Sequence, residues 1–207
     1  MSETVVVIDF ETTGLSPEHG GRATEVAAVI VSNGAIVDRY QSLMNAGMYI
    51  PPFIESLTGI SNRMIRQAPG AAAVIAELAE FIGEIPLVAH NAAFDRKFLQ
   101  AELQRIGQPQ QAKMLCSMRM ARRIYPNAAN HKLATLVRHV RIAETGVYHR
   151  ALADAEMTAG LWLKMQEELE NTFSLESVPL ALLEKIQSAP CNGLRGCVEA
   201  YRRSSCE

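Results

Sequence analysis

Long apolar segments are absent from this sequence. No run of about 18 apolar residues occurs, and the beginning of the chain has no basic region followed by an apolar stretch. We therefore expect neither a membrane span nor a signal peptide, and hence a cytoplasmic protein. The 207 residues, of which 48% are hydrophobic and 20% charged, are enough for one folded domain with a full core.

Cysteine is scarce and unevenly placed. The chain has four cysteines, and three of them lie in the last 17 residues. A disulfide framework is unusual in a chain of this size without a secretory signal. A zinc site would need closer pairs or a nearby histidine, which residues 174–207 lack. We expect reduced thiols at Cys116, Cys191, Cys197 and Cys206.

A large excess of charge of one sign is also missing, since the formal net charge is −2. This balance argues against a protein that coats long stretches of nucleic acid. Between Lys113 and Arg141, however, seven residues are Lys or Arg and none is Asp or Glu. Such a basic strip suits phosphate groups, and a solvated helical face that happens to be basic is the alternative. Aromatic residues that could stack on bases are few, chiefly Phe10, Phe53 and Tyr125.

Hydrophobic periodicity predicts a mixed α/β fold. Five apolar runs have the length of strands, and Asn33-Gly34 between the second and third is a strong hairpin signal. Helical periodicity alternates with the later strands, which predicts a five-stranded sheet flanked by helices. Residues 48–61 are expected to form a proline-bearing loop with one helical turn. The expected strands are 4–10, 24–32, 35–43, 85–90 and 111–116, and the expected helices are 70–83, 91–106, 117–124, 132–140 and 151–170.

The first strand ends in two acids. In the stretch VVVIDFETTG, Asp9 and Glu11 are two residues apart and share a strand face with Val5 and Val7. Two like charges side by side in an apolar setting repel each other, and burying them without compensation is expensive. The pair therefore indicates that something compensates its charge.

Two further acids lie on apolar helix faces. Asp95 falls on the stripe that carries Leu99 and Leu103, and Asp154 shares its face with Leu161. Taken alone, an Asp early in a helix is more often an N-cap or a partner of the helix dipole. Several carboxylates that converge on the end of a central strand, however, stay ionised only if cations neutralise them.

Mg²⁺ or Mn²⁺ would suit such a site because both ions prefer hard oxygen ligands. Two such ions about 3.5–4 Å apart are the usual arrangement for displacement at a phosphodiester, one activating a water and the other stabilising the leaving oxygen. We expect two ions, held by Asp9, Glu11, Asp95 and Asp154.

A proton acceptor for the attacking water is also present. His149 precedes Asp154 by five residues, a spacing that does not fit one helical face, so we expect it on the loop that enters the helix. Its unperturbed pKa of about 6.5 suits a general base at neutral pH. The alternative is an ordinary polar loop histidine, and the neighbouring Asp154 favours catalysis.

Three motifs, taken in order, resemble one enzyme family. They are VIDFETTGL with Asp-x-Glu, HNAAFD with Asn-x-x-Phe-Asp, and HRALAD with His-x-x-x-x-Asp. Their order and separation resemble the DEDDh 3′–5′ exonucleases, a group that includes the proofreading epsilon subunit of bacterial DNA polymerase III and ribonuclease T. LTGIS at 57–61 and HKLATL at 131–136 are also similar to the family, and the likeness spans about residues 4–165.

The resemblance implies a ribonuclease H-like fold and metal-dependent release of 5′-mononucleotides from a 3′ end. It implies that Asp9 bridges both metal ions, that Glu11 and Asp154 complete the first metal site, and that Asp95 supports the second. In the same way, it implies that His149 deprotonates the attacking water.

The resemblance also implies contacts with the substrate. Backbone groups from Thr12 to Leu15 would meet the terminal nucleotide, with Leu15 as an apolar wedge against its base. Asn91 and Phe94 would organise the helix of the third acid, and Lys132 in the basic strip would contact phosphates. The expected substrate-binding residues are Thr12, Thr13, Gly14, Leu15, Asn91, Phe94, His131 and Lys132.

The expected activity is a 3′–5′ exonuclease that acts on the 3′ ends of nucleic acid, single-stranded DNA above all, with little sequence specificity. The alternatives are an RNA-trimming exoribonuclease of the same family, a phosphohydrolase of free nucleotides, and a catalytically inert nucleic-acid-binding module. A DNA polymerase or another replication or repair protein is the expected kind of protein partner, and the oligomeric state is left open.

Two further predictions concern the division of the chain into domains and the acid Glu25. The texture of the sequence changes near Phe173, so we expect an exonuclease domain over 1–173 and a partly helical appendage over 174–207. Glu25, on the second expected strand, is either a supporting partner of the site or merely a partly buried acid.

Overall fold

Five strands form one mixed sheet in the computed structural model, which describes residues 3–108, 113–143 and 148–204. The strands lie in the order β3-β2-β1-β4-β5. β1, β2 and β3 are antiparallel neighbours, whereas β4 pairs with β1, and β5 with β4, in parallel. The predicted mixed five-stranded sheet is thereby confirmed. The strands are β1 (Val5–Thr12), β2 (Ala23–Ser32), β3 (Ala35–Leu43), β4 (Leu87–Ala89) and β5 (Met114–Cys116).

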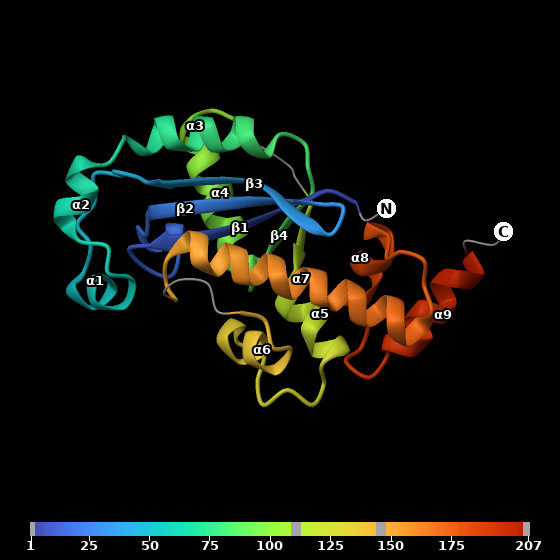
Figure 1. The fold of residues 1–207 in the computed structure, drawn as a ribbon. Coiled ribbons are helices and arrows are strands. Elements are labelled where there is room, and N and C mark those ends of the chain that lie inside the picture. The colour runs from blue at the N-terminus through green and yellow to red at the C-terminus, as the bar shows by residue number, and fades with distance from the viewer. Residues whose placement is uncertain (1–2, 109–112, 144–147, 205–207) are drawn as a thin grey trace.

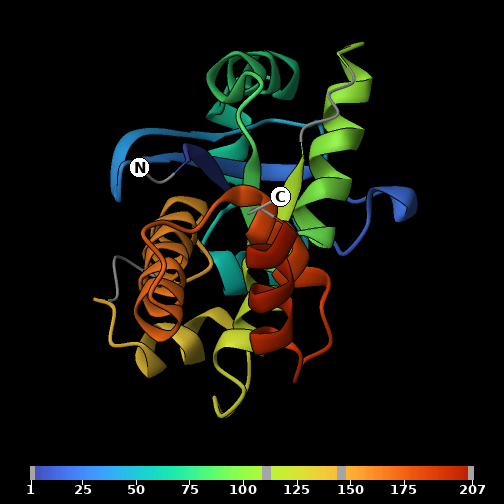
Figure 2. The same ribbon diagram turned by 90° about the vertical axis from the view of Figure 1, so that its right-hand side faces the viewer.

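Helices cover both faces of this sheet. α3 lies above the sheet and α7 below it in both views (Figure 1, Figure 2). α4 packs on the same face as α3, and α5 and α6 pack on the same face as α7. The helices are α3 (Ala71–Ile82), α4 (Ala93–Arg105), α5 (Ser117–Ile124), α6 (Leu133–His139) and α7 (Ala151–Phe173).

β1 reads as a continuous apolar run because both of its faces are buried. Val5 and Val7 belong to the core cluster between the sheet and α7, whereas Val6 belongs to the cluster between the sheet and the helices α3 and α4. Side chains alternate across a strand. Asp9 and Glu11, which continue the row of Val5 and Val7, therefore lie on the α7 face at the end of the central strand.

Residues 48–61 are more helical than the sequence analysis predicted. α1 (Pro52–Thr58) stands where a loop with one helical turn was expected, and α2 (Asn62–Gln67) follows it in a stretch for which no element was predicted. Proline suits the first turn of α1 because its missing N–H is not needed there, and Gly59 ends the helix with a φ of 70°. The side chain of Ser61 caps α2. The proline, glycine and serine that mark these helix ends are visible in the sequence. The prediction of a loop was wrong because these signals were not used.

The C-terminal segment, which was expected to be a partly helical appendage, forms two helices. α8 (Leu180–Ser188) and α9 (Leu194–Ser204) follow α7. Leu183 of α8 is buried in the core cluster that also contains residues of α7 and of the lower face of the sheet. Gln187 Oε1 accepts a hydrogen bond of 2.9 Å from the backbone N of Cys116 in β5. α8 therefore packs directly against the sheet, and the division of the chain at residue 173 stays a prediction.

The cysteines lie in different environments. Cys116 is buried, Cys197 is half-buried and Cys191 is exposed, and all three are free thiols. Cys206 lies outside the described residues. Within the described ranges, no helix combines the length and the apolar character that crossing a membrane requires.

Candidate active site

A cleft of about 420 Å³ opens at the carboxyl end of β1. Its walls come from segments far apart in the sequence: the end of β1 with the loop after it, α1, the start of α4, and the start of α7. The predicted site residues that line it are Asp9, Glu11, Thr12, Gly14, Leu15, Asn91, Phe94, Asp95, His149 and Asp154.

Each acid is positioned by the end of a strand or the start of a helix. Glu11 lies near the end of β1, directly opposite Glu25 of β2. Asp95 lies in the first turn of α4 with 2% of its surface exposed, and its Oδ1 accepts a hydrogen bond of 3.2 Å from the backbone N of Phe10. Asp154 lies in the first turn of α7. The first turn of a helix favours negative charge, which helps both helices to hold an acid at the cleft.

Burial raises the pKa values of all four acids, and neighbouring negative charges add to the shift at Asp9, Glu11 and Asp154. Burial first, and then the charges of Asp95 and Asp154, hold the pKa of Asp9 well above its usual value. Burial, Asp154 and Glu25 raise the pKa of Glu11 to about 8. Burial raises the pKa of Asp95 to about 7 and also raises the pKa of Asp154. Such a cluster is fully ionised at neutral pH only beside a cation.

The donor set fits a divalent metal ion. A carboxylate oxygen of Glu11, one of Asp154 and a ring nitrogen of His149 lie within 4.8 Å of one another. Oδ1 of Asp154 is buried and has no hydrogen-bond partner among the described residues. Buried oxygens without a partner are rare in proteins, and coordination would satisfy this one. Hard oxygen donors of this kind suit Mg²⁺ or Mn²⁺.

His149 lies on the loop that enters α7, in the position that its spacing from Asp154 predicted. Its φ of 64° is in the left-handed region, which residues other than glycine seldom adopt. Its backbone N donates a hydrogen bond of 3.0 Å to Oδ2 of Asp154, and its side chain is exposed and lines the cleft. The backbone of His149 is thus tied to one of the acids that its ring accompanies.

Asn91 shapes the turn between β4 and α4. Its φ of 71° is one that Asn tolerates better than most residues, and its carbonyl oxygen accepts a hydrogen bond of 2.9 Å from the backbone N of Phe94. The ring of Phe94 packs on that of Phe98, with centroids 5.0 Å apart. This turn and this ring contact set the first turn of α4, which carries Asp95.

The last residue of β1 and the loop after it contribute three of the four residues predicted there to the cleft: Thr12, Gly14 and Leu15. The Thr12 hydroxyl donates a hydrogen bond of 2.7 Å to the carbonyl oxygen of Gly14, and Leu15 is 82% exposed. The structure does not bring Thr13 into the lining. Its Oγ1 instead accepts a hydrogen bond of 3.0 Å from the backbone N of Arg22, which fastens the loop to the start of β2.

His131 and Lys132 also lie outside the lining of the cleft. Nε2 of His131 lies 3.1 Å from the carbonyl oxygen of Tyr125. Lys132 is exposed at the N-cap position of α6. Their contact with substrate stays a prediction.

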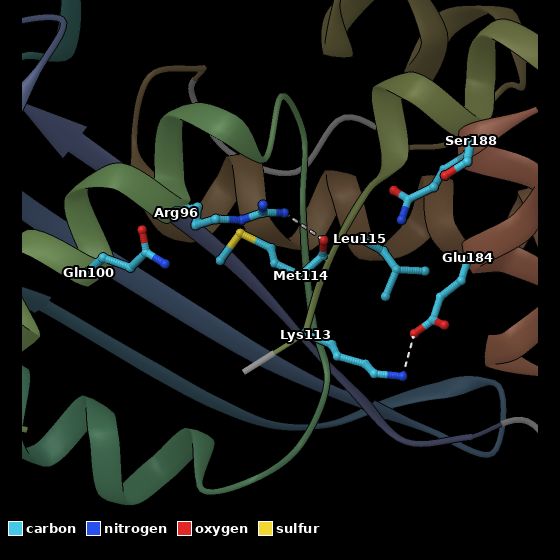
Figure 3. A pocket seen from close by; sticks show the side chains of 8 residues that line it. Arg96, Gln100, Lys113, Met114, Leu115, Glu184 and Ser188 are labelled. Atoms are coloured by element: carbon cyan, nitrogen blue, oxygen red, sulfur yellow. Dashed lines mark hydrogen bonds and ion pairs between the residues drawn. The ribbon is translucent and has the colours of Figure 1, made fainter. Parts of the chain in front are cut away.

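A second cleft, of about 440 Å³, lies between α4, β5 and α8 (Figure 3). Nη2 of Arg96 donates a hydrogen bond of 2.9 Å to the carbonyl oxygen of Met114. Nζ of Lys113, the first residue of the basic strip, pairs with Oε1 of Glu184 at 3.0 Å. The charged groups Arg96, Lys113 and Glu184 of this cleft are engaged within the protein, whereas the predicted acids line the first cleft.

Sequence reasoning missed His90, which also lines the first cleft. Its Nδ1 lies 2.9 Å from Oγ of Ser117, and its Nε2 lies 3.0 Å from the carbonyl oxygen of His131. Burial lowers the pKa of His90 to about 4, so its ring is neutral at pH 7. Its place directly before Asn91 in HNAAFD was the signal that could have found it.

The wall that α1 supplies was missed as well, because its segment was expected to be a loop. Phe53 and Leu57 line the cleft and are 67% and 48% exposed. Phe53 had been noted only as an aromatic residue able to stack on a base. Together with Leu15, these side chains give the acid-bearing cleft an exposed apolar wall.

Comparison with known proteins identifies relatives of most of the chain. The sequence profile of the exonuclease family RNase_T matches residues 6–162. The 3′-5′ exonuclease DinG of Bacillus subtilis is 37% identical over 165 residues, which are 79% of this chain and 18% of that protein. DNA polymerase III subunit epsilon of Aquifex aeolicus is 35% identical over 167 residues, which are 80% of this chain and 82% of that protein.

Two solved structures share the fold. Exonuclease X in complex with 5′ overhanging duplex DNA superposes with a TM-score of 0.67 at 28% identity, over 84% of this chain and 95% of that one. Exonuclease I of E. coli in complex with a dT13 oligonucleotide has a TM-score of 0.70 at 16% identity, over 83% of this chain and 43% of that one. The chain spans less than a fifth of DinG and 12% of the PolC-type DNA polymerase III of Bacillus subtilis.

Proposed function

This chain belongs to the RNase_T exonuclease family, and on that premise we propose that it is a metal-dependent 3′–5′ exonuclease acting on single-stranded DNA. One observation carries the proposal. Asp9, Glu11, Asp95 and Asp154 meet with His149 in one cleft, where their raised pKa values call for a cation.

Asp9, Glu11, Asp95 and Asp154 would hold two Mg²⁺ or Mn²⁺ ions. When bound, such ions polarise a water and neutralise charge at the phosphate. The fit rests on the hard oxygen donors of these four side chains and on Oδ1 of Asp154, which lacks a hydrogen-bond partner within residues 3–108, 113–143 and 148–204.

His149 serves as the general base. It accepts a proton from the water that attacks the phosphorus of the last phosphodiester. The bond between that phosphorus and the 3′ oxygen of the preceding nucleotide breaks, and the terminal nucleotide leaves as a 5′-mononucleotide. The 3′ oxygen takes a proton from solvent, so the shortened strand ends in a 3′ hydroxyl. The exposed side chain of His149 beside Glu11 and Asp154 supports this role.

The shape of the cleft favours an unpaired 3′ end. A volume of about 420 Å³ suits a single nucleotide better than a base pair. Leu15, Phe53 and Leu57 offer apolar surface on which an unpaired base can stack. DNA is favoured over RNA because the relative of matching length is named as a subunit of a DNA polymerase.

That relationship also suggests the setting of the activity. We propose that the protein works beside a DNA polymerase or another replication or repair protein in the cytoplasm. The exposed Lys132 and the exposed arginines of the basic strip would hold the backbone of the strand being degraded.

The experiment is a panel of oligonucleotides labelled at either end, as DNA and RNA and as single and double strands. With Mg²⁺ or Mn²⁺, we expect a 5′-labelled DNA strand to shorten step by step and a 3′-labelled strand to release labelled mononucleotide at once. A chelator should abolish both. Faster loss of RNA would move the substrate to RNA, activity on free nucleotides alone would indicate a phosphohydrolase, and binding without cleavage would indicate an inert binding module.

A further inference from the structure

Glu25 is a fully buried acid beside the catalytic acids. It lies on β2 opposite Glu11, with none of its surface exposed. Both carboxylate oxygens are engaged. Oε1 accepts hydrogen bonds from Nη2 of Arg150 at 2.8 Å and Nε2 of Gln41 at 2.7 Å. Oε2 accepts them from Nε of Arg150 and the backbone N of Ala151, both at 3.1 Å.

The partners of Glu25 directly follow His149 in the chain. Arg150 is the N-cap residue of α7, and Ala151 is the first residue of that helix. On its other side, His149 donates its backbone N–H to Asp154. The left-handed turn at His149 is therefore held from two directions, by Glu25 through the next two residues and by Asp154 directly.

Stability alone is a weak reason for such a pair. Replacing a buried ion pair with apolar residues is often neutral or stabilising, because desolvation offsets the attraction. A left-handed φ at a residue other than glycine, by contrast, is unfavourable and persists only where the surroundings impose it. The bidentate geometry of Arg150 on Glu25 imposes a fixed orientation on the chain at this point.

We propose that Glu25 and Arg150 are positioning residues that aim the imidazole of His149 into the acid cleft. The inference rests on the proposed function, because it assigns the pair a task in that same reaction. The competing explanation is electrostatic, since Arg150 lies near enough to Glu11 to favour the charged form of that acid.

Glu25→Gln keeps the shape of the side chain and removes its charge. We expect kcat on an oligonucleotide to fall about 10- to 100-fold, the range for partners that orient a catalytic group, while KM changes little. In the metal-free protein, amide hydrogen exchange at residues 149–151 should accelerate. Glu156→Gln is the matched control, because it removes another ion pair between the sheet and α7, with Arg39, and leaves the turn at His149 untouched.

A double-mutant cycle separates the two explanations. If Glu25 acts through His149, Glu25→Gln should lower kcat in the wild-type background and leave the residual kcat of His149→Ala unchanged. An equal fold loss in both backgrounds would overturn the proposal in favour of the electrostatic explanation. Arg150→Lys keeps the charge but loses the bidentate contact with Glu25. The positioning proposal therefore expects this variant to lose activity, whereas the electrostatic explanation expects it to keep activity.

Exchange at residues 149–151 needs no substrate, so it distinguishes the failure of this inference from that of the proposed function. If the wild-type protein does not degrade oligonucleotides but Glu25→Gln loosens this turn, the activity is wrong and the positioning stands. If exchange at the turn is the same in Glu25→Gln and the wild type, the positioning is wrong, whatever the activity.

Discussion

The two carboxylate oxygens of Asp154 differ in their contacts. Oδ2 accepts a hydrogen bond from the backbone N of His149, whereas Oδ1 is buried and has no hydrogen-bond partner in the part of the chain that the structure describes. This division suits an acid that binds the protein with one oxygen and a cation with the other. A substitution that removes the negative charge of Asp154 but keeps the hydrogen bond from His149 should therefore lower activity and leave folding intact.

Asp154→Asn should lower turnover by about 10³-fold or more, because it removes a charged metal ligand. The fold should persist, since an amide oxygen can still accept the hydrogen bond from His149 and the neighbouring acids lose a repulsive charge. Steady-state turnover with Mn²⁺ and thermal unfolding of the metal-free protein measure the two effects. Asp38→Asn, on an exposed part of β3, is the control. Normal turnover of Asp154→Asn would refute the assignment.

His149 makes a sharper test, because its side chain is exposed and its structural contact is through the backbone. His149→Ala should lose about 10²- to 10⁴-fold in kcat, the range of general acid–base catalysis. Binding of Mn²⁺, followed by titration calorimetry, should change far less than in Asp154→Asn. If His149→Ala abolishes binding of the ion, His149 is a metal ligand rather than the base.

At the scale of elements, α1 supplies exposed apolar side chains to the wall of the cleft. It is a helix of seven residues that projects Phe53 and Leu57 into the mouth of the cleft. Its neighbour α2 and a small apolar cluster of Ile50, Ile54, Ile60 and Ile65 hold it in place. Under the proposed function, we therefore expect the acids to act on any 3′ end that enters the cleft and α1 to limit which ends can enter.

Phe53→Ala should weaken the binding of a single-stranded oligonucleotide by about 1–3 kcal/mol, the range for a base stacked on an aromatic ring. Stability should hardly change, since the side chain of Phe53 is 67% exposed. Fluorescence anisotropy with Ca²⁺ in place of Mg²⁺ measures binding without cleavage. Val37→Ala, at an apolar position on β3 that is 59% exposed, should bind as the wild type does. Equal affinity of Phe53→Ala and the wild type would remove α1 from the substrate site.

At the scale of the whole molecule, the fold brings charges together at a cost that depends on pH. Glu11 has a pKa of about 8 and Asp95 one of about 7, against ordinary values of 4.5 and 3.8. At pH values between the ordinary and the raised pKa of each acid, the folded protein binds more protons than the unfolded chain. Stability contributed by these groups is therefore present at low pH and lost as the pH rises.

In a chelator, the free energy of unfolding should fall as the pH rises from about 5 to 8. Urea unfolding at a series of pH values measures the slope. Glu11→Gln should flatten it because one of the titrating groups is gone, and Mn²⁺ at pH 8 should restore stability by binding the ionised acids. A slope that is the same in Glu11→Gln would mean that other groups cause the dependence.

The sequence by itself determined the elements and the identity of the acids. Strand and helix periodicity is local, so the run before Asp9, the hairpin at Asn33-Gly34 and the long helix of Asp154 could be read directly. The acids stood out because charge on an apolar face needs compensation. α1 was misjudged although its proline and glycine signals are also local.

Only the tertiary structure decided which side chains meet. Glu25 could not be ranked from the sequence, because the partner that explains it, Arg150, lies 125 residues away. The Thr13 hydroxyl accepts a hydrogen bond from the backbone N of Arg22 and Thr13 does not line the cleft, whereas His90 does. Such outcomes depend on how layers pack rather than on local pattern, and packing is settled by contacts between distant parts of the chain.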